Sequence, residues 1–129
     1  MTHNSAITIT PFLTVNDGKK ALDFYVSAFG ATQKMKHELP NGKLNAELVI
    51  QNASFFIGDE EPEFGNLSPE KYPNNSLRLI LTTPEADKLF DQALQLGAIS
   101  ICPMTTEEEW RIGKLKDPFG HIWEIGYVL

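Results

Sequence analysis

Cysteine is nearly absent from this sequence of 129 residues, and the single copy rules out a disulfide within the chain. That residue, Cys102, lies between Ile101 and Pro103 in an apolar stretch that favours a strand. We therefore expect a buried structural thiol there rather than a nucleophile, because a reactive thiolate needs a polar and accessible setting.

Histidine is also scarce, and the three copies, His3, His37 and His121, have no metal-ligand spacing such as H-x-x-x-H. The sequence likewise contains no Ser-His-Asp, P-loop or dinucleotide-binding motif. The common signatures of nucleophilic catalysis and of nucleotide binding are therefore missing.

Basic side chains are outnumbered, with 11 Lys and Arg against 17 Asp and Glu and a net charge of −6. This balance argues against a nucleic-acid partner, because binding to phosphates needs clustered Lys and Arg. No apolar run approaches the roughly 20 residues of a membrane span, and residues 1–5 lack a charged-then-apolar signal pattern. We expect a soluble, cytoplasmic protein without a nucleic-acid or membrane partner.

The sequence does contain a repeated order of strands and helix. Residues 7–15 alternate between apolar and polar side chains and predict a strand, with Pro11 marking an edge or a bulge. Asn16 and Asp17 offer a cap for a helix that ends at Gly30. A hairpin follows, with its two strands at 33–39 and 43–51, and a further strand is predicted at 54–58.

The same order returns after an acidic connector that is rich in proline, at residues 60–75. A strand is predicted from Leu77 to Thr82, then a helix that starts at Thr83 and Pro84 and ends at Gly97. The last three strands are predicted at 99–103, 110–116 and 121–128. We therefore expect an α+β protein, a single domain over residues 1–129, with two tandem βαβββ units at 5–59 and 76–129.

The last hairpin of this pattern carries a carboxylate in mid-strand. Asp117, Pro118 and Gly120 favour a tight turn, and the strand after it has Glu124 on one face and His121 on the other. A carboxylate beside bulky apolar residues is costly to bury unless a cation pairs with it. For His121 we expect a structural hydrogen bond rather than a catalytic role.

The pattern resembles the vicinal-oxygen-chelate superfamily, which includes glyoxalase I, bleomycin-resistance proteins and extradiol dioxygenases. The resemblance covers nearly the whole chain and depends most on residues 14–17, 21–25, 29–31 and 117–124, with the last segment reading D-P-F-G-H-I-W-E. Together with N-A-E-L at 45–48, this motif is most similar to the PhnB-like branch. The resemblance implies that the two units form a cupped mixed sheet, the glyoxalase/bleomycin-resistance fold, which is commonly completed in a homodimer.

In the metal-using members of this superfamily the cup carries four ligands, and the resemblance places them at Thr10, Phe56, Arg78 and Glu124. Only Glu124 binds a cation well, because zinc and iron sites use several imidazole, thiolate or carboxylate ligands. No cofactor is therefore expected, and a divalent metal is the alternative. We predict instead that Arg78 and Glu124 form a buried ion pair, in which removing one partner costs about 3–5 kcal/mol. The other possibility is that both side chains are solvated at a wide mouth of the cup.

Glu47 and several aromatic residues complete the predicted ligand-binding site. Glu47 would either bind a cationic ligand or act as a general base in the cup, or else pair with a residue of a neighbouring strand. Phe12 and Trp110, with Phe55 or Phe56, are expected to line an aromatic pocket suited to flat ligands. Packing in the core is the alternative for at least one of these rings.

Three functions compete on this basis. The first is binding of a small molecule in the cup without a catalytic metal, and the replaced ligand positions favour it over an enzyme. The second is a metal-dependent isomerase, lyase or dioxygenase, which would need other ligands, such as Glu47 or His37 joining Glu124. The third is a dimeric interaction module whose cup is filled with side chains. A homodimer is expected because two open cups leave apolar sheet edges uncovered.

Overall fold

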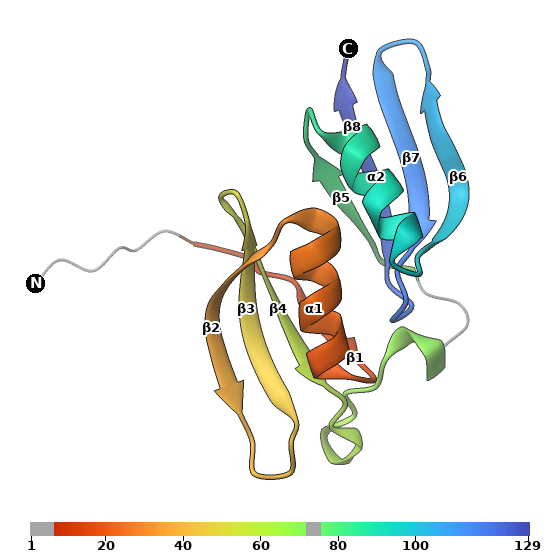
Figure 1. The fold of residues 1–129 in the computed structure, drawn as a ribbon. Coiled ribbons are helices and arrows are strands. Elements are labelled where there is room, and N and C mark those ends of the chain that lie inside the picture. The colour runs from red at the N-terminus through yellow and green to blue at the C-terminus, as the bar shows by residue number, and fades with distance from the viewer. Residues whose placement is uncertain (1–6, 72–75) are drawn as a thin grey trace, which may run out of the picture.

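The computed structural model describes residues 7–71 and 76–129. Two βαβββ units are present, as predicted, and each consists of a four-stranded mixed sheet with one helix packed on it (Figure 1). His3, the predicted first two residues of the first unit and residues 72–75 of the predicted connector lie outside the described residues.

The first unit contains β1 (Phe12–Val15), α1 (Gly18–Phe29), β2 (Thr32–Glu38), β3 (Leu44–Ile50) and β4 (Ala53–Asp59). Its strands lie in the order β1-β4-β3-β2, with β1 parallel to β4 and the other neighbours antiparallel. The strict alternation of buried and half-buried residues along β3 shows that one face of this sheet packs against α1.

The second unit repeats this arrangement with β5 (Arg78–Thr82), α2 (Ala86–Gln95), β6 (Ile99–Thr106), β7 (Trp110–Lys116) and β8 (Ile122–Val128). Its strand order is β5-β8-β7-β6, and β5 is parallel to β8. The described part of the connector between the units contains two short 3-10 helices, η1 (Pro62–Phe64) and η2 (Pro69–Lys71).

The first strand is shorter than predicted. It begins at Phe12 rather than at Ile7, and both Ile7 and Ile9 are almost fully exposed. Pro11 explains the difference, because it has no backbone N–H to contribute to a ladder and only its carbonyl oxygen pairs, accepting from the N–H of Phe56 at 2.8 Å. The alternation in residues 7–10 therefore does not correspond to a strand.

Helix α1 has the ends that the sequence predicted. The Asp17 side chain accepts a hydrogen bond from the N–H of Lys20 at 3.1 Å, and Gly30 closes the helix with φ of 69°. A second carboxylate also caps this helix: Asp59, at the end of β4, accepts from the N–H groups of Gly18 and Leu44, each at 2.8 Å. Asp59 thus ties the start of α1 to β3 and β4.

The hairpin between β7 and β8 joins the two units through Asp117, which is almost fully buried. Asp117 accepts hydrogen bonds from Tyr25 Oη at 2.5 Å and Trp123 Nε1 at 2.9 Å, and from the N–H groups of Phe119 and His121. The expected structural hydrogen bond of His121 is also present, because its Nε2 lies 2.8 Å from the carbonyl oxygen of Thr14 in the first unit.

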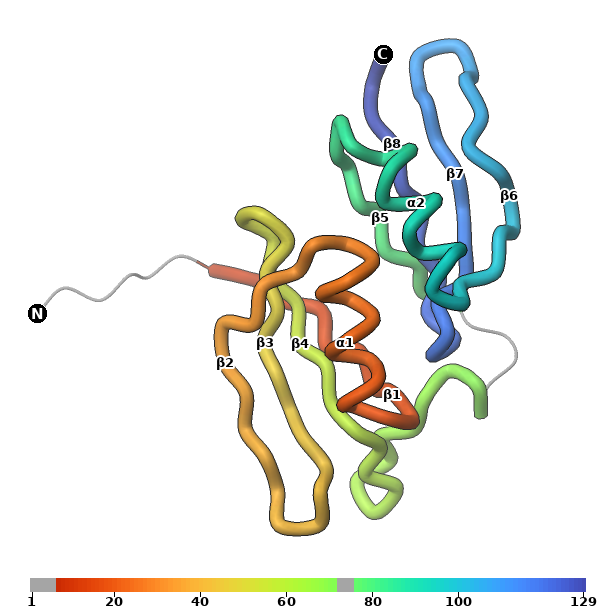
Figure 2. The backbone as a smooth tube through the Cα atoms, viewed as in Figure 1, coloured from red at the N-terminus to blue at the C-terminus, as the bar shows by residue number. Residues whose placement is uncertain are grey.

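Both helices lie on the same side of the molecule. Figure 1 shows α1 in front of the first sheet and α2 in front of the second, and α1 packs against α2 (Figures 1 and 2). We call the face of each sheet opposite its helix the open face. The two open faces point to the same side, away from the viewer in Figure 1, so they do not face each other within one chain. Among the described helices, none is long and apolar enough to cross a membrane.

Candidate functional site

The open face of the second sheet holds a cavity of about 530 Å³. Alternate residues of a strand point to the same side, which brings Trp110, Ile112 and Lys114 of β7 together on this face. The cavity is lined by Ile80, Cys102, Pro103, Thr105, Glu107, Trp110, Ile112, Gly113, Lys114 and Glu124. All of these residues belong to the second unit.

The predicted ion pair between Arg78 and Glu124 is present, since Arg78 Nε donates to Glu124 Oε2. Its burial, however, differs from the expectation: the Arg78 side chain is 57% exposed and the Glu124 side chain 22%. Water reaches both groups because no element among residues 7–71 and 76–129 covers this open face. An exposed pair contributes about 0–1 kcal/mol, so the predicted cost of 3–5 kcal/mol for removing one partner is wrong for the single chain.

The open face of the first sheet carries an aromatic surface. The rings of Phe12 and Phe56 stack with centroids 6.0 Å apart and an interplanar angle of 13°, and Phe12 is 52% exposed. Gly58 makes room for this arrangement, because a Cβ atom there would lie 2.7 Å from Cζ of Phe12. Phe55, the other ring considered from the sequence, is buried on the helix side against Tyr25.

Glu47 also lies on the first open face, where its Oε2 is 3.6 Å from Nζ of Lys34 on β2. Of the two possibilities for this carboxylate, pairing with a residue of a neighbouring strand is the one seen in the structure. Thr10 lies just outside β1 and is partly exposed.

Strand register shows which residues of the two units are equivalent. In the first unit, Phe12 of β1 pairs with Phe56 of β4. In the second unit, Ile80 of β5 pairs with Glu124 of β8. Phe56 and Glu124 therefore occupy equivalent positions in the two sheets. Phe56 in turn lies opposite Glu47, and Glu124 lies opposite Lys114. The two units therefore place opposite charges, Glu47 and Lys114, at equivalent positions.

Lys114 is a residue of the open face that we did not single out from the sequence. Its ammonium group has no ion pair among the described residues, although it lies across from Glu124, which is bonded to Arg78. The alternation along residues 110–116 was the available signal, because it places Lys114 on the same face as Trp110. Only the register of β7 against β8 shows that Lys114 sits beside the carboxylate.

The thiol of Cys102 is not buried, contrary to the expectation from its apolar neighbours. It lies on β6, an edge strand whose residues are mostly exposed, and it lines the cavity of the second open face. The apolar sequence around it therefore belongs to an uncovered strand rather than to the core.

The residues at the four positions that hold the metal ligands in metal-using members of the superfamily cannot bind a metal ion together. Thr10 offers one hydroxyl and Phe56 no donor, while Arg78 adds a positive charge and occupies the carboxylate of Glu124. His37, considered as a substitute ligand, is exposed on β2 in the other unit. Within residues 7–71 and 76–129, no group of three or more His, Cys, Asp or Glu side chains could hold a metal ion.

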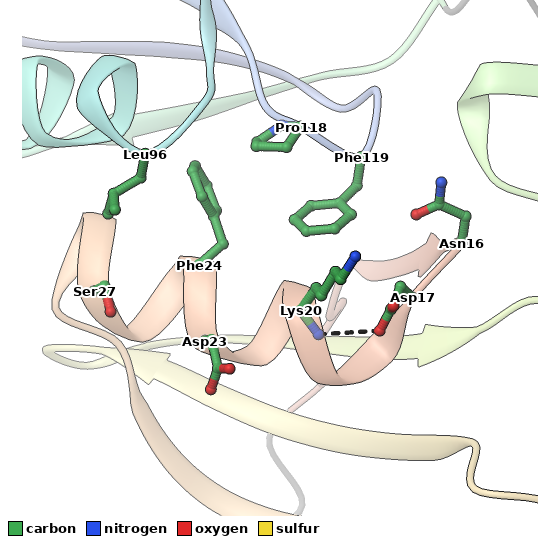
Figure 3. A pocket seen from close by; sticks show the side chains of 9 residues that line it. All are labelled: Asn16, Asp17, Lys20, Asp23, Phe24, Ser27, Leu96, Pro118 and Phe119. Carbon is green, nitrogen blue, oxygen red and sulfur yellow. Dashed lines mark hydrogen bonds between the residues drawn. The ribbon is translucent and has the colours of Figure 1, made fainter.

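A second cavity, of about 610 Å³, lies on the helix side between α1 and the turn of the last hairpin (Figure 3). Figure 3 shows Phe24 and Phe119 side by side above α1, and both are buried in the core. Asp17 at the rim is engaged with the N–H of Lys20. Since its aromatic rings are already packed and its rim is polar, this cavity is a weaker candidate than the open face.

Comparison with known proteins adds a family and a fold. A family profile described as the Glyoxalase/Bleomycin resistance protein/Dioxygenase superfamily matches residues 7–125. The uncharacterized protein Mb0911c of Mycobacterium bovis is 32% identical over 132 residues, which cover 98% of this chain and 86% of that protein.

Two solved structures share the fold. The Arabidopsis thaliana gene product At5g48480 has a TM-score of 0.70 at 26% identity, covering 93% of this chain and 98% of its own. A glyoxalase family protein from Bacillus cereus has a TM-score of 0.77 at 13% identity, covering 100% and 99% of the two chains. Both matches extend over the two βαβββ units.

Proposed function

Because the chain belongs to the Glyoxalase/Bleomycin resistance protein/Dioxygenase superfamily, we propose that it binds a small, flat organic molecule on its open faces without a catalytic metal. The observation that carries this proposal is the exposed aromatic surface. Phe12 is 52% exposed and Trp110 40%, and Trp110 borders a cavity of a volume that small ligands occupy. Stacking on such rings favours flat ligands.

We further propose that a second copy of the chain completes the site. Exposed apolar residues lie on both open faces, with Phe12 on the first and Ile80, which is 65% exposed, on the second. A homodimer in which the first open face of one protomer covers the second open face of its partner would bury these residues and enclose a ligand between them.

Two finer points belong to the same proposal. The sequence motifs at residues 117–123 and 45–48 support membership of the PhnB-like branch. A cytoplasmic location is supported by the accessible free thiol of Cys102, because free thiols persist in reducing compartments.

The competing functions differ in what they require. A metal-dependent isomerase, lyase or dioxygenase needs a set of donor side chains, and Arg78 already neutralises the carboxylate of Glu124. An interaction module with a filled cup needs side chains in the space that the cavity of the second open face leaves free. Both observations support the binding of a small molecule over these two alternatives.

Calorimetric titration with 2-naphthamide, a flat neutral aromatic, tests the proposal. We expect saturable binding that Trp110→Ala weakens by up to about tenfold, because stacking on an aromatic ring contributes about 0.5–1.5 kcal/mol beyond area burial. Phe64→Ala is the matched control, since Phe64 is an exposed ring on η1 and does not line the cavity of the second open face.

Equal weakening by Trp110→Ala and Phe64→Ala would place binding elsewhere. Elemental analysis of the purified protein gives an independent check on the metal. Stoichiometric zinc, nickel, manganese or iron would contradict the proposal in favour of the metal-dependent enzyme.

A further inference from the structure

We propose that the ligand of the second open face is an aromatic compound carrying an anionic group such as a carboxylate, held by the ammonium of Lys114 and the indole of Trp110. This inference rests on the proposed function, because it specifies the class of molecule that the same face binds. It depends on three observations. Lys114 and Trp110 lie on the same face of one strand, the charged side chains around the cavity leave Lys114 without an ion pair among the described residues, and the surface between Lys114 and Trp110 is apolar.

The two side chains share one strand face and one cavity. Trp110, Ile112 and Lys114 are alternate residues of β7, and all three line the cavity of about 530 Å³. At about 3.3 Å per residue, the Cα atoms of Trp110 and Lys114 lie roughly 13 Å apart, a distance that their long side chains shorten. A ring stacked on the indole can therefore present a substituent to the ammonium group.

The carboxylate opposite Lys114 is already engaged. Glu124 lies opposite Lys114 in the β7–β8 register, but its Oε2 is bonded to Arg78. Glu47 occupies the equivalent position in the first unit, where Lys34 is its partner at 3.6 Å. In the described part of the chain, Lys114, a half-buried residue, thus has no carboxylate of its own.

Glu107 is the other carboxylate that lines the cavity, and it lies at the exposed end near Trp110. Water screens a charge in such a position more strongly than a half-buried one. The net charge of −6 acts over longer distances, and at physiological ionic strength it is screened beyond about 8 Å. The local positive charge of Lys114 therefore decides which ligand group is favoured beside it.

The surface between the two groups is apolar. Ile112 lies between Trp110 and Lys114 on β7, and Ile80 of β5 contributes an exposed side chain to the same cavity. An ammonium at the edge of an apolar surface matches an amphiphilic ligand, because the ring covers the apolar residues while the anion forms a charge-assisted hydrogen bond.

The test compares 2-naphthoate with 2-naphthamide, which have the same ring and differ in charge. Isothermal titration of the full chain should show that the carboxylate binds about tenfold more tightly than the amide, the size of effect that a single charge-assisted hydrogen bond supports. Lys114→Gln should remove this preference, and Lys114→Arg should retain most of it.

Lys116→Gln is the matched control. Lys116 lies on the same face of β7, two residues along, and does not line the cavity. The preference for the carboxylate should persist in this variant. Trp110→Ala should weaken both compounds by the same factor, because the ring contributes equally to each.

The outcomes separate this inference from the proposed function. If the wild-type protein binds both compounds equally, the anionic class is wrong while binding of flat molecules stands. If Lys114→Gln keeps the preference for the carboxylate, the assignment of the anion to Lys114 is wrong, and the inference fails at that point. If neither compound binds, both proposals fail.

Sedimentation velocity tests an alternative role for Lys114, in which it forms an ion pair with Glu47 of the partner subunit instead of binding a ligand. Dissociation of the homodimer by K114E, with recovery in the charge-reversed double variant E47K/K114E, would overturn the inference. Unchanged association of K114E would support it, since Lys114 would then be available to a ligand.

Discussion

At the scale of single residues, the side chain that joins most of the structure is Asp117. Its buried carboxylate accepts hydrogen bonds from two backbone N–H groups of its own turn, from Trp123 and from Tyr25, which lies 92 positions earlier in the chain. A buried carboxylate is costly unless each lone pair is used, and here the turn and the two aromatic side chains supply the donors. Asp117 therefore fixes the turn and the contact between the units together.

We expect Asp117→Asn to lower the free energy of unfolding by about 2–4 kcal/mol, because an amide N–H₂ would face the donors of Tyr25 and Trp123 and leave at least one unsatisfied. Urea unfolding followed by circular dichroism measures the change. Asp91→Asn is the control, since Asp91 is exposed and bonds only to Gln95 among the side chains described. A loss no larger than that of the control would contradict this account of Asp117.

Tyr25 makes the folding stability decrease with pH in the alkaline range. Burial raises the pKa of its phenol well above 10.0, and the charge of Asp117 and the hydrogen bond to it act in the same direction. The unfolded chain releases this proton near pH 10, whereas the folded chain keeps it. The stability that this group contributes is thus fully present below about pH 10 and is lost as the pH rises towards the folded-state pKa.

Unfolding free energies of the wild-type protein and Tyr25→Phe, measured between pH 9 and pH 11, test this effect. Above pH 10 the difference between the two proteins should shrink by up to about 1.4 kcal/mol per pH unit, because only the wild type has the raised phenol pKa. Parallel curves across this range would show that the phenol of Tyr25 does not titrate differently in the folded and unfolded states.

At the scale of secondary-structure elements, the start of α1 has two carboxylate caps of different origin. Asp17 precedes the helix and is recognisable from the sequence, whereas Asp59 reaches the N–H of Gly18 from the end of β4, 41 residues away. The second cap also accepts from Leu44 at the start of β3. Asp59 therefore connects the helix with two strands of its sheet.

Asp17→Ala should cost about 1 kcal/mol of unfolding free energy, as is typical for loss of an N-cap side chain. Asp59→Ala should cost more, about 2–3 kcal/mol, because it leaves two partly buried N–H groups without their acceptor. Asp23→Ala, an exposed position on the same helix, serves as the control. The order would be wrong if Asp17→Ala proved the more damaging change in denaturant titrations.

At the scale of the whole molecule, the decisive feature is that both open faces point to one side. A single chain of 14.4 kDa leaves Phe12, Ile80 and Trp110 in contact with water. Exposed apolar residues on both open faces are typical of an interface or a ligand site, and the proposed homodimer uses them as both.

Light scattering after size-exclusion chromatography should give about twice the mass of one chain at micromolar concentration. Ile80→Glu should shift the protein to the monomer, because it introduces a charge on the surface that the second copy covers. Val26→Glu is the control, since Val26 is an exposed apolar residue on α1. A wild-type monomer would contradict the homodimer, as would an Ile80→Glu variant that stays associated.

The sequence by itself determined the two βαβββ units, the ends of α1, the turn at Asp117 and the strand faces that bring Arg78 next to Glu124. The strands, the helix ends and the turn follow from periodicity and local turn chemistry, which act over a few residues. They can therefore be predicted without knowing how the elements pack. The meeting of Arg78 and Glu124 was expected from the resemblance to the superfamily, which placed the first and last strands of the unit in one cup.

Only the tertiary structure decided which of these surfaces is covered. It placed Cys102 on an exposed edge strand and left the Arg78–Glu124 pair in contact with water. It also brought Lys114 opposite Glu124, which is paired with Arg78, so that Lys114 has no ion pair within residues 7–71 and 76–129. Burial and charge pairing depend on which elements meet, and the same alternating strand can face a helix, a ligand or water. For that reason the open faces, and the ligand class inferred from them, could not be predicted from the order of residues.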